Sequence, residues 1–430
     1  MVTTSPKSIP DINNSEHDEN NDAKRIIGIT NDGSLPITVS DNPIIDAFDR
    51  IRVSTPETIF DSKQIFDNLP LFWDDQEVSG TGTSSTYSKP KACTNMAVSA
   101  STAGKRVRQT FMRFNYQPGK SQLILMTTRL TVGGTGIKAS VGQFDDNNGI
   151  FFTSDNGVMK VVIRSSTSGS AVDREVTQSN FNLDTMDGNG PSGITIDPTK
   201  TQILIFDYEW LGVGRVRMGF VIDGIIHYCH NFNNTNNMDV VYMSTPNLPL
   251  RYEIENDGTG GAADIDHICC TVMSEGGTNK LGVLRHYNSP SLSALGSGTS
   301  YISMAGRLKT THFGANIELE NISVIASSTN DFCKWELWAG GTYSGTLNYV
   351  DFQNSAVQIA DGAKTVTHNR DGILIDGGFF TSSLPSANQV PNALKLGSSI
   401  DDTPQEFYFV VTPITNNITV ESSITWRELN

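Results

Sequence analysis

The sequence is poor in charge. Only 18 % of its 430 residues are Asp, Glu, Lys or Arg, and 46 acidic residues against 31 basic ones give a formal net charge of −15. A low charged fraction indicates a surface of neutral polar groups, as in chains that pack into assemblies. Because phosphate binding needs a local excess of Lys and Arg, no nucleic-acid partner is expected.

Long apolar runs are also missing. No stretch approaches the roughly 20 consecutive apolar residues of a membrane span, so no membrane partner is expected. The segment 1–24, MVTTSPKSIPDINNSEHDENNDAK, has no apolar core and is not expected to act as a secretory signal. Cysteine is scarce, with five scattered residues, which favours reduced thiols in a reducing compartment.

What is present is the two-residue period of β-strands. In RVRMGFVI, the apolar residues Val216, Met218 and Phe220 alternate with arginine and glycine, so one face of the strand should lie on a core. The run stops at Asp223-Gly224, a dipeptide suited to a two-residue hairpin turn, and resumes as IIHYCHNF. Many such segments, and no convincing helix pattern, predict an all-β protein built of antiparallel sandwiches.

Composition divides the chain into four parts. Residues 1–45 are acidic and Asn-rich and are expected to form an extended arm that a neighbour orders. Residues 81–290 predict one β-sandwich, and residues 291–430 predict a second one of jelly-roll size. Between arm and sandwich, residues 46–80 are too apolar for a linker and predict a clamp laid across the main domain or a neighbouring subunit. The apolar anchors proposed for this assembly role are Phe48, Ile51, Val53, Phe60, Phe66 and Trp73.

Five phrases of the sequence resemble a known family: DAFDRIRVSTPETIFDSKQ, FDDNNGIFF, DGNGPSGI, FDYEWLGVGRVRMGFVIDG and VYMSTPNLPLRYEI. They are similar to virion structural proteins of tailed bacteriophages, and the resemblance covers residues 40–430. It implies a concanavalin-like sandwich on a particle, as a capsid decoration, head fibre, or tail or collar component. It also implies a virion location after synthesis in the host cytoplasm, with capsid, portal or tail proteins as partners.

Oxygen-rich turns offer one candidate metal site. Asp145 and Asp146 precede Asn147-Asn148-Gly149, and Asp155 follows closely before Asn156-Gly157. Clustered carboxylates could hold Ca²⁺, although the spacing is not that of an EF-hand. Plain turn formation by Asn-Gly and Asp-Gly is the alternative, so no cofactor is expected beyond this calcium candidate.

Glycosidase chemistry requires two carboxyl groups facing one sugar bond. Glu253 and Glu255 share a strand face, as do Glu318 and Glu320, but both pairs are interpreted as solvated sheet faces, and no catalytic residue is expected. Three tryptophans are candidates for sugar stacking or for a subunit interface. They are Trp210 and the pair Trp335 and Trp338, which an odd spacing places on opposite faces of a strand, so that one of the pair is a candidate for exposure.

The leading hypothesis is a non-enzymatic structural component of a bacteriophage virion that assembles as a homo-oligomer through its arm and sandwich surfaces. The alternative is a carbohydrate-binding sandwich that attaches to a glycan on the host surface, with carbohydrate cleavage less favoured. The sequence leaves open the station on the particle, the order of the oligomer and the receptor.

Overall fold

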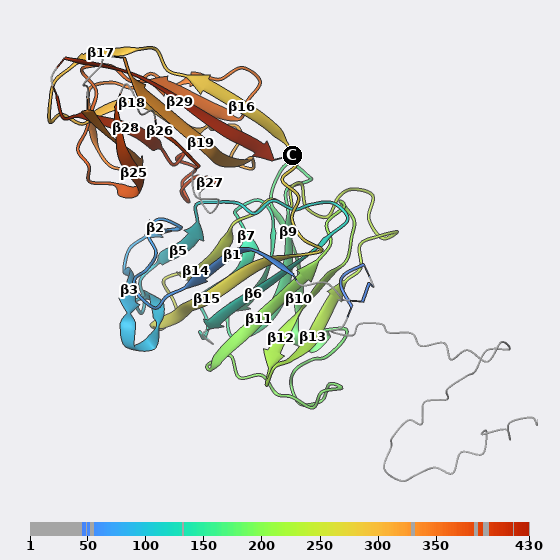
Figure 1. The fold of residues 1–430 in the computed structure, drawn as a ribbon. Coiled ribbons are helices and arrows are strands. Elements are labelled where there is room, and N and C mark those ends of the chain that lie inside the picture. Colours follow the sequence, from blue (N-terminus) through green and yellow to red (C-terminus); the bar gives the residue numbers. More distant parts are fainter. Residues whose placement is uncertain are drawn as a thin grey trace, which may run out of the picture. The chain divides into compact units, whose positions relative to one another are not determined.

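The computed structural model describes residues 45–48, 50–51, 56–130, 133–327, 332–381, 386–389, 395–415 and 417–429. Within these ranges the chain is built of antiparallel β-strands with two short 3₁₀ helices, η1 (Lys89–Lys91) and η2 (Gln178–Asn180) (Figure 1). The strands form two successive sandwiches, so the predicted all-β class is confirmed. The predicted arm lies outside the described residues except for Ile45. No helix in the described ranges is long and apolar enough to cross a membrane.

The first sandwich pairs an eight-stranded sheet with a seven-stranded sheet. The eight-stranded sheet has the order β13-β12-β11-β6-β15-β4-β3, and β1 lies beside β15. Its strands are β1 (Glu57–Lys63), β3 (Thr83–Ser88), β4 (Cys93–Val98), β6 (Ser121–Arg129), β11 (Thr201–Tyr208), β12 (Val216–Ile222), β13 (Ile225–Phe232) and β15 (Ala263–Glu275).

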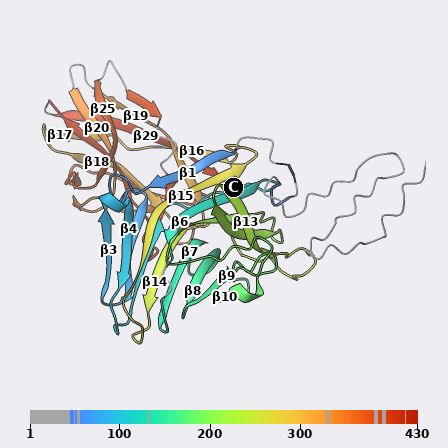
Figure 2. The same ribbon diagram turned by 90° about the horizontal axis from the view of Figure 1, so that it is seen from below.

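The seven-stranded sheet has the order β10-β9-β8-β7-β14-β5-β2. Figure 2 shows β14, β7, β8, β9 and β10 side by side. Its strands are β2 (Trp73–Gly80), β5 (Gly104–Thr110), β7 (Ile137–Phe144), β8 (Gly149–Asp155), β9 (Val158–Ser165), β10 (Val172–Thr177) and β14 (Leu250–Asn256).

The second sandwich also has two sheets. In one, β16-β29-β19-β26 lie in order, with β17 beside β29 and β27 beside β19. Their bounds are β16 (Val283–Asn288), β17 (Leu292–Leu295), β19 (Asn316–Ala326), β26 (Ser386–Gln389), β27 (Lys395–Leu396) and β29 (Ile418–Leu429). The other has the order β21-β24-β18-β28-β20-β25, with β23 beside β18 and β22 beside β23. Its strands are β18 (Tyr301–Leu308), β20 (Phe332–Ala339), β21 (Tyr343–Ser344), β22 (Val350–Asp351), β23 (Val357–Asp361), β24 (Thr367–His368), β25 (Ile373–Thr381) and β28 (Phe407–Pro413).

The β12–β13 hairpin has the predicted turn. Asp223 and Gly224 have φ of 51° and 79°, the positive values that a two-residue hairpin turn requires at both central positions. Val216, Met218 and Phe220 are buried in the core between the two sheets, as their alternation predicts. In mid-strand, a Cβ atom on Gly219 would come within 2.1 Å of the His227 carbonyl oxygen. Glycine therefore allows the close approach at the bulge in this pairing.

The segment predicted to be a clamp supplies structural strands of the first sandwich. β1 pairs with β15 and β2 pairs with β5, so residues 57–63 add a strand to the eight-stranded sheet and residues 73–80 add a strand to the seven-stranded sheet. Phe60 and Trp73 are buried in the core, and Phe48 is half-buried. Ile51 is 61 % exposed and Phe66 is 79 % exposed, so neither packs on the sandwich of its own chain as one alternative predicts. Val53 lies outside the described residues.

Two apolar segments near the end of the range 81–290 are not strands of the first sandwich. The segment 238–246, MDVVYMSTP, is not a strand, because its backbone pairs elsewhere: the Tyr242 amide donates to the Gly212 carbonyl, and Met243 accepts from the Trp210 indole. β16, at 283–288, pairs with β29 and so belongs to the second sandwich, although the range 81–290 predicts it in the first. Apolar content alone does not tell whether such a segment forms a strand, or which sandwich the strand joins.

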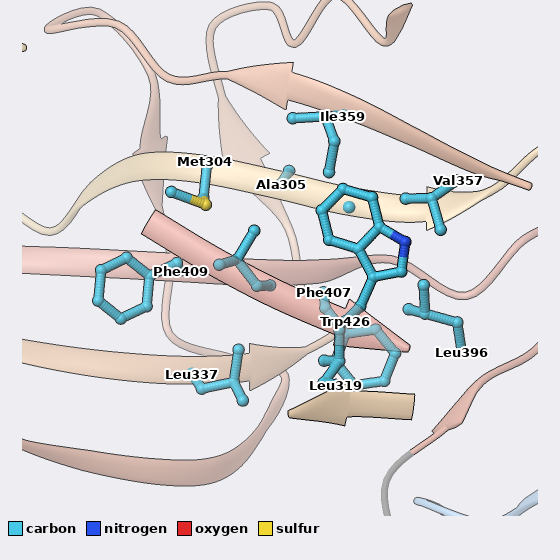
Figure 3. Close-up of a pocket in the computed structure, with 12 residues that line it drawn as sticks. Met304, Ala305, Leu319, Leu337, Val357, Ile359, Leu396, Phe407, Phe409 and Trp426 are labelled. Carbon is cyan, nitrogen blue, oxygen red and sulfur yellow. The ribbon is translucent and has the colours of Figure 1, made fainter. Parts of the chain in front are cut away.

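The interior of the second sandwich is closed and apolar. Figure 3 shows Trp426, Phe407 and Phe409 turned into a space between the sheets. The cavity there measures about 20 Å³ and is lined by apolar residues. It has room for one water-sized group, and a water needs polar partners that this lining does not offer. We interpret it as a packing gap and not as a ligand site.

Candidate functional site

Three irregular segments meet at one end of the first sandwich. They are the β7–β8 turn at 145–148, the β9–β10 turn at 166–171, and the segment 233–249. Asn148 joins them, since its Nδ2 donates to Ser166 Oγ at 3.1 Å and its Oδ1 accepts from the Ser244 amide at 2.9 Å. The hydroxyls of Ser166 and Ser244 are 2.9 Å apart. These hydrogen bonds hold the three segments in one arrangement, which we call the loop end.

A pocket of about 250 Å³ lies between β9, β10 and the segment 233–249. We call it the β9–β10 pocket. Its lining combines apolar groups with hydroxyls and one cation, and comprises Ile163, Ser165, Thr167, Ser168, Val172, Arg174, Met238 and Tyr242. Tyr242 is buried, and its hydroxyl donates to the Glu209 carbonyl, which fixes the ring in place. The pocket therefore has a rigid apolar base and a polar rim.

Arg174 reaches across the open edge between the two sheets. Its Nη2 donates to Asn234 Oδ1 at 2.5 Å, its Nη1 lies 3.5 Å from Met238 Sδ, and its Cζ lies 4.9 Å from the centre of the Phe232 ring. Burial lowers the pKa of Arg174 from its usual value. Burial, and secondarily the charge of Arg174, lower the pKa of His230 to about 4. Arg174 itself is exposed, and its charge adds to the burial that disfavours the protonated form of His230.

The outer face of the seven-stranded sheet holds a network of ion pairs. Arg251 donates to Gln109 Oε1 at 2.7 Å and to Asp146 Oδ1 at 2.5 Å, and Lys105 pairs with Glu253 at 3.0 Å. Burial opposes ionisation of Asp146, but Arg251 more than offsets it and lowers the pKa of Asp146. Glu253 is buried, so its interpretation as part of a solvated face is wrong. The network neutralises its charges internally.

Two stacked aromatic rings lie on the same face. The centres of Phe144 and Phe151 are 4.3 Å apart, and arginines cover them: Arg251 lies 5.4 Å from Phe144, and Arg164 lies 5.1 Å from Phe151. Both rings are 1 % exposed. They stabilise the sheet and are not open to a ligand.

The three carboxylates of the calcium candidate bind different partners. Asp145 accepts the amides of Asn147 and Asn148 at 2.8 Å and pairs with Arg113 at 2.6 Å. Asp146 pairs with Arg251, and Asp155 pairs with Lys160 at 2.8 Å. In the part of the chain that the structure describes, no three His, Cys, Asp or Glu residues gather in a way that could hold a metal ion. The oxygen ligands are engaged as turn caps and ion pairs.

The tryptophan candidates are positioned as packing residues. Trp335 lies in the core of the second sandwich and is 1 % exposed. Trp338 does face the opposite side, but it is 6 % exposed in a second apolar cluster with Leu347 and Tyr408. The proposal that one of this pair is exposed is therefore wrong. Trp210 is half-buried at the loop end, where its Nε1 donates to the Met243 carbonyl.

Sequence reasoning missed the β9–β10 pocket and Arg174. The only local signal was the hydroxyl-rich turn RSSTSGSA between two strands. Met238 and Tyr242, which complete the pocket, lie more than 60 positions further along the chain. Nothing in a linear pattern places them opposite that turn.

Comparison with known proteins gave structural similarity only. No family model matches the chain, and no curated protein matches it. Among solved structures, the carbohydrate recognition domain of Emp47p is 10 % identical, covering 51 % of this chain and 97 % of that one, with a TM-score of 0.33. A legume lectin-like domain from Entamoeba histolytica is 8 % identical (51 % and 98 %, TM-score 0.31). The CBM2 module of the evolved Dit of Lactobacillus casei BL23 phage J-1 is 8 % identical (52 % and 98 %, TM-score 0.34).

Proposed function

We propose that this chain is a non-catalytic carbohydrate-binding protein and that its first sandwich holds a saccharide in the β9–β10 pocket. The observation that carries the proposal is the composition of that pocket. Ile163, Val172 and Met238 supply apolar surface, while Ser165 and the β9–β10 turn supply hydroxyls. A sugar ring presents C–H groups on its faces and hydroxyls at its edge, so it needs both kinds of contact at once.

Pre-organisation of the loop end supports binding. The β9–β10 turn is held by Asn148 and Ser244, and Ser168 Oγ donates to the Ser170 carbonyl inside the turn. The turn is therefore already ordered before a ligand enters the pocket, and binding has to order few further groups. Lower ordering cost leaves more of the contact energy as affinity.

Binding without cleavage is favoured by the positions of the carboxylates. No Asp or Glu lines the pocket within the described residues. Glu253 is held by Lys105 and Arg251, and Glu318 is paired with Lys395 at 3.4 Å. A glycosidase needs one carboxyl group free to protonate the leaving oxygen and a second one facing the sugar. Carboxylates held by cations do not fit that requirement.

A glycan array probed with the full chain tests the proposal. Val172→Trp fills the pocket from an exposed position, since Val172 is 57 % exposed. Val158→Trp is the matched control, because Val158 is 44 % exposed and does not line the pocket. We expect the unmodified chain and V158W to bind a shared set of saccharides and V172W to bind none of them. An array with no bound saccharide, or equal binding by V172W, would refute the proposal.

The second candidate function is that of a virion structural component which assembles as a homo-oligomer. An exposed apolar patch on the second sandwich favours it: Phe332 is 51 %, Phe379 70 % and Ile414 53 % exposed. The pairing of β20 with β25 places Phe379 opposite Lys334, two residues from Phe332, and the Ile414 amide bonds to the Phe332 carbonyl. Apolar groups gathered in this way mark contact surfaces. Mass spectrometry of purified particles tests this candidate, and absence of the protein from them would exclude it.

A further inference from the structure

The charge of Arg174 is not balanced by a carboxylate. Seven other arginines of the first sandwich are ion-paired: Arg106 and Arg108 with Asp75, Arg113 with Asp145, Arg129 with Asp264 and Asp266, Arg164 with Asp173, Arg217 with Asp207, and Arg251 with Asp146 and Glu253. Arg174 contacts an amide oxygen, a thioether and a ring, all of which are neutral. The pocket thus presents a cation that the sandwich itself leaves without a counter-charge.

The acidic residues nearest in sequence point elsewhere. Asp173 and Glu175 flank Arg174 on β10, where alternation turns them to the other face of the sheet. There Asp173 pairs with Arg164 at 2.7 Å and Glu175 pairs with Lys160 at 2.8 Å. Asp239, next to the pocket residue Met238, is exposed and makes no ion pair with Arg174 within 4 Å. No carboxylate of the described chain competes for this guanidinium.

The contacts of Arg174 hold the guanidinium in place but leave most of its donors unused. A guanidinium has five N–H donors, and the contacts with Asn234 and Met238 use two of them. The hydroxyls of Ser165 and Thr167 are 3.0 Å apart, so one of them donates to the other and one hydroxyl hydrogen remains. A fixed guanidinium beside a hydroxyl donor is suited to the two oxygens of a carboxylate or sulfate.

We propose that the β9–β10 pocket selects saccharides that carry an oxyanion substituent, a carboxylate or a sulfate, and that Arg174 is the residue that recognises it. This rests on the proposed function, since it names the class of saccharide that the same pocket takes. The oxyanion pairs with the guanidinium and accepts a hydrogen bond from the hydroxyls of Ser165 or Thr167. The ring of the sugar then lies against Val172 and Met238.

Calorimetric titration of the full chain with three oligosaccharides of one backbone tests the selection: neutral, uronic-acid-bearing and sulfated. We expect at least one acidic ligand to bind roughly tenfold or more tightly than the neutral one, in line with charge-assisted hydrogen bonds. Arg174→Gln should remove that difference, so that the acidic and neutral ligands bind it with similar affinity. Arg174→Lys keeps the charge without the bidentate geometry. Its preference for acidic ligands should be weaker than that of the unmodified chain and stronger than that of Arg174→Gln. Arg164→Gln, which removes an ion-paired arginine outside the pocket, is the control and should keep the preference.

The outcomes separate this inference from the proposed function. If the neutral and acidic ligands bind equally and Arg174→Gln changes neither, the selection is refuted while carbohydrate binding stands. If no oligosaccharide binds, but sulfate alone shifts the NMR signals of the pocket residues and does not shift them in Arg174→Gln, the oxyanion site stands and carbohydrate binding is refuted. If neither oligosaccharides nor sulfate bind, both are refuted.

Discussion

Replacing Arg217 by methionine should destabilise the first sandwich and release the segment 45–48. Arg217 and Asp207 form an ion pair in which both side chains are 0 % exposed, and the Tyr228 hydroxyl donates to the same carboxylate at 2.7 Å. Arg217 also donates to the Ile45 carbonyl at 2.7 Å. One side chain therefore neutralises a buried charge and fastens a chain segment to the outer face of the eight-stranded sheet.

The expected magnitude follows from the missing counter-charge. Removing one partner of a buried ion pair costs about 3–5 kcal/mol, because the remaining ion stays desolvated without its partner. With a urea m-value of about 2–3 kcal/mol per molar, the unfolding midpoint should fall by roughly 1–2.5 M. Ile45 is 1 % exposed and would lose its anchor, so trypsin should cleave after Arg50 faster than in the unmodified chain.

Urea unfolding followed by tryptophan fluorescence measures this effect. Lys160→Met is the control, since Lys160 and its partners Asp155 and Glu175 are partly exposed, and such pairs contribute about 0–1 kcal/mol. The double variant Asp207→Leu/Arg217→Met removes both charges and should regain much of the lost stability. The reasoning would be wrong if R217M and K160M moved the midpoint equally, or if the double variant were less stable than R217M.

Three further predictions follow from the structure and the sequence. The pKa of His230 is about 4 in the folded chain and about 6.5 when unfolded, so the unfolded state takes up this proton first as pH falls. The free energy of unfolding should therefore decline from about pH 6.5 to pH 4 by on the order of 3 kcal/mol. Urea unfolding across that range should show a weaker decline in His230→Asn. If the apolar patch joins copies of the chain, Phe379→Ser should lower the mass measured by size-exclusion chromatography with light scattering, and an unchanged mass would exclude Phe379 from the contact. Deleting residues 1–40 should leave a folded protein that fails to join particles, as measured by mass spectrometry, and normal incorporation would show that the arm is not the attachment element.

Local signals in the sequence were sufficient for strands and for some turns. The positive φ values of Asp223 and Gly224 follow from residue type, and the burial of Val216, Met218 and Phe220 follows from alternation, because both depend on neighbours within a few positions. The same alternation correctly placed Trp335 and Trp338 on opposite faces. It did not reveal that Leu347 and Tyr408 cover Trp338 from other segments.

The same limit explains the error in the segment predicted to be a clamp. A dense set of apolar residues at 46–80 indicates burial but not the partner that provides it. Phe60 and Trp73 lie in the core because β1 and β2 extend the two sheets, whereas the residues between those strands form a turn that leaves Phe66 exposed. Burial of these residues depends on strand pairing, which joins β1 to residues about 200 positions away and β2 to residues about 30 positions away.

By itself the sequence determined that the chain is all-β, with strands of one apolar face joined by tight turns, because periodicity and turn chemistry are local properties. Only the tertiary structure decided which strands share a sheet and which side chains share a pocket. Arg174 illustrates the difference: in VDREVT it is one charge among acids, and alternation across the sheet separates it from Asp173 and Glu175 and places it beside Asn234 and Met238. Its unbalanced charge results from long-range pairing, which no local pattern specifies.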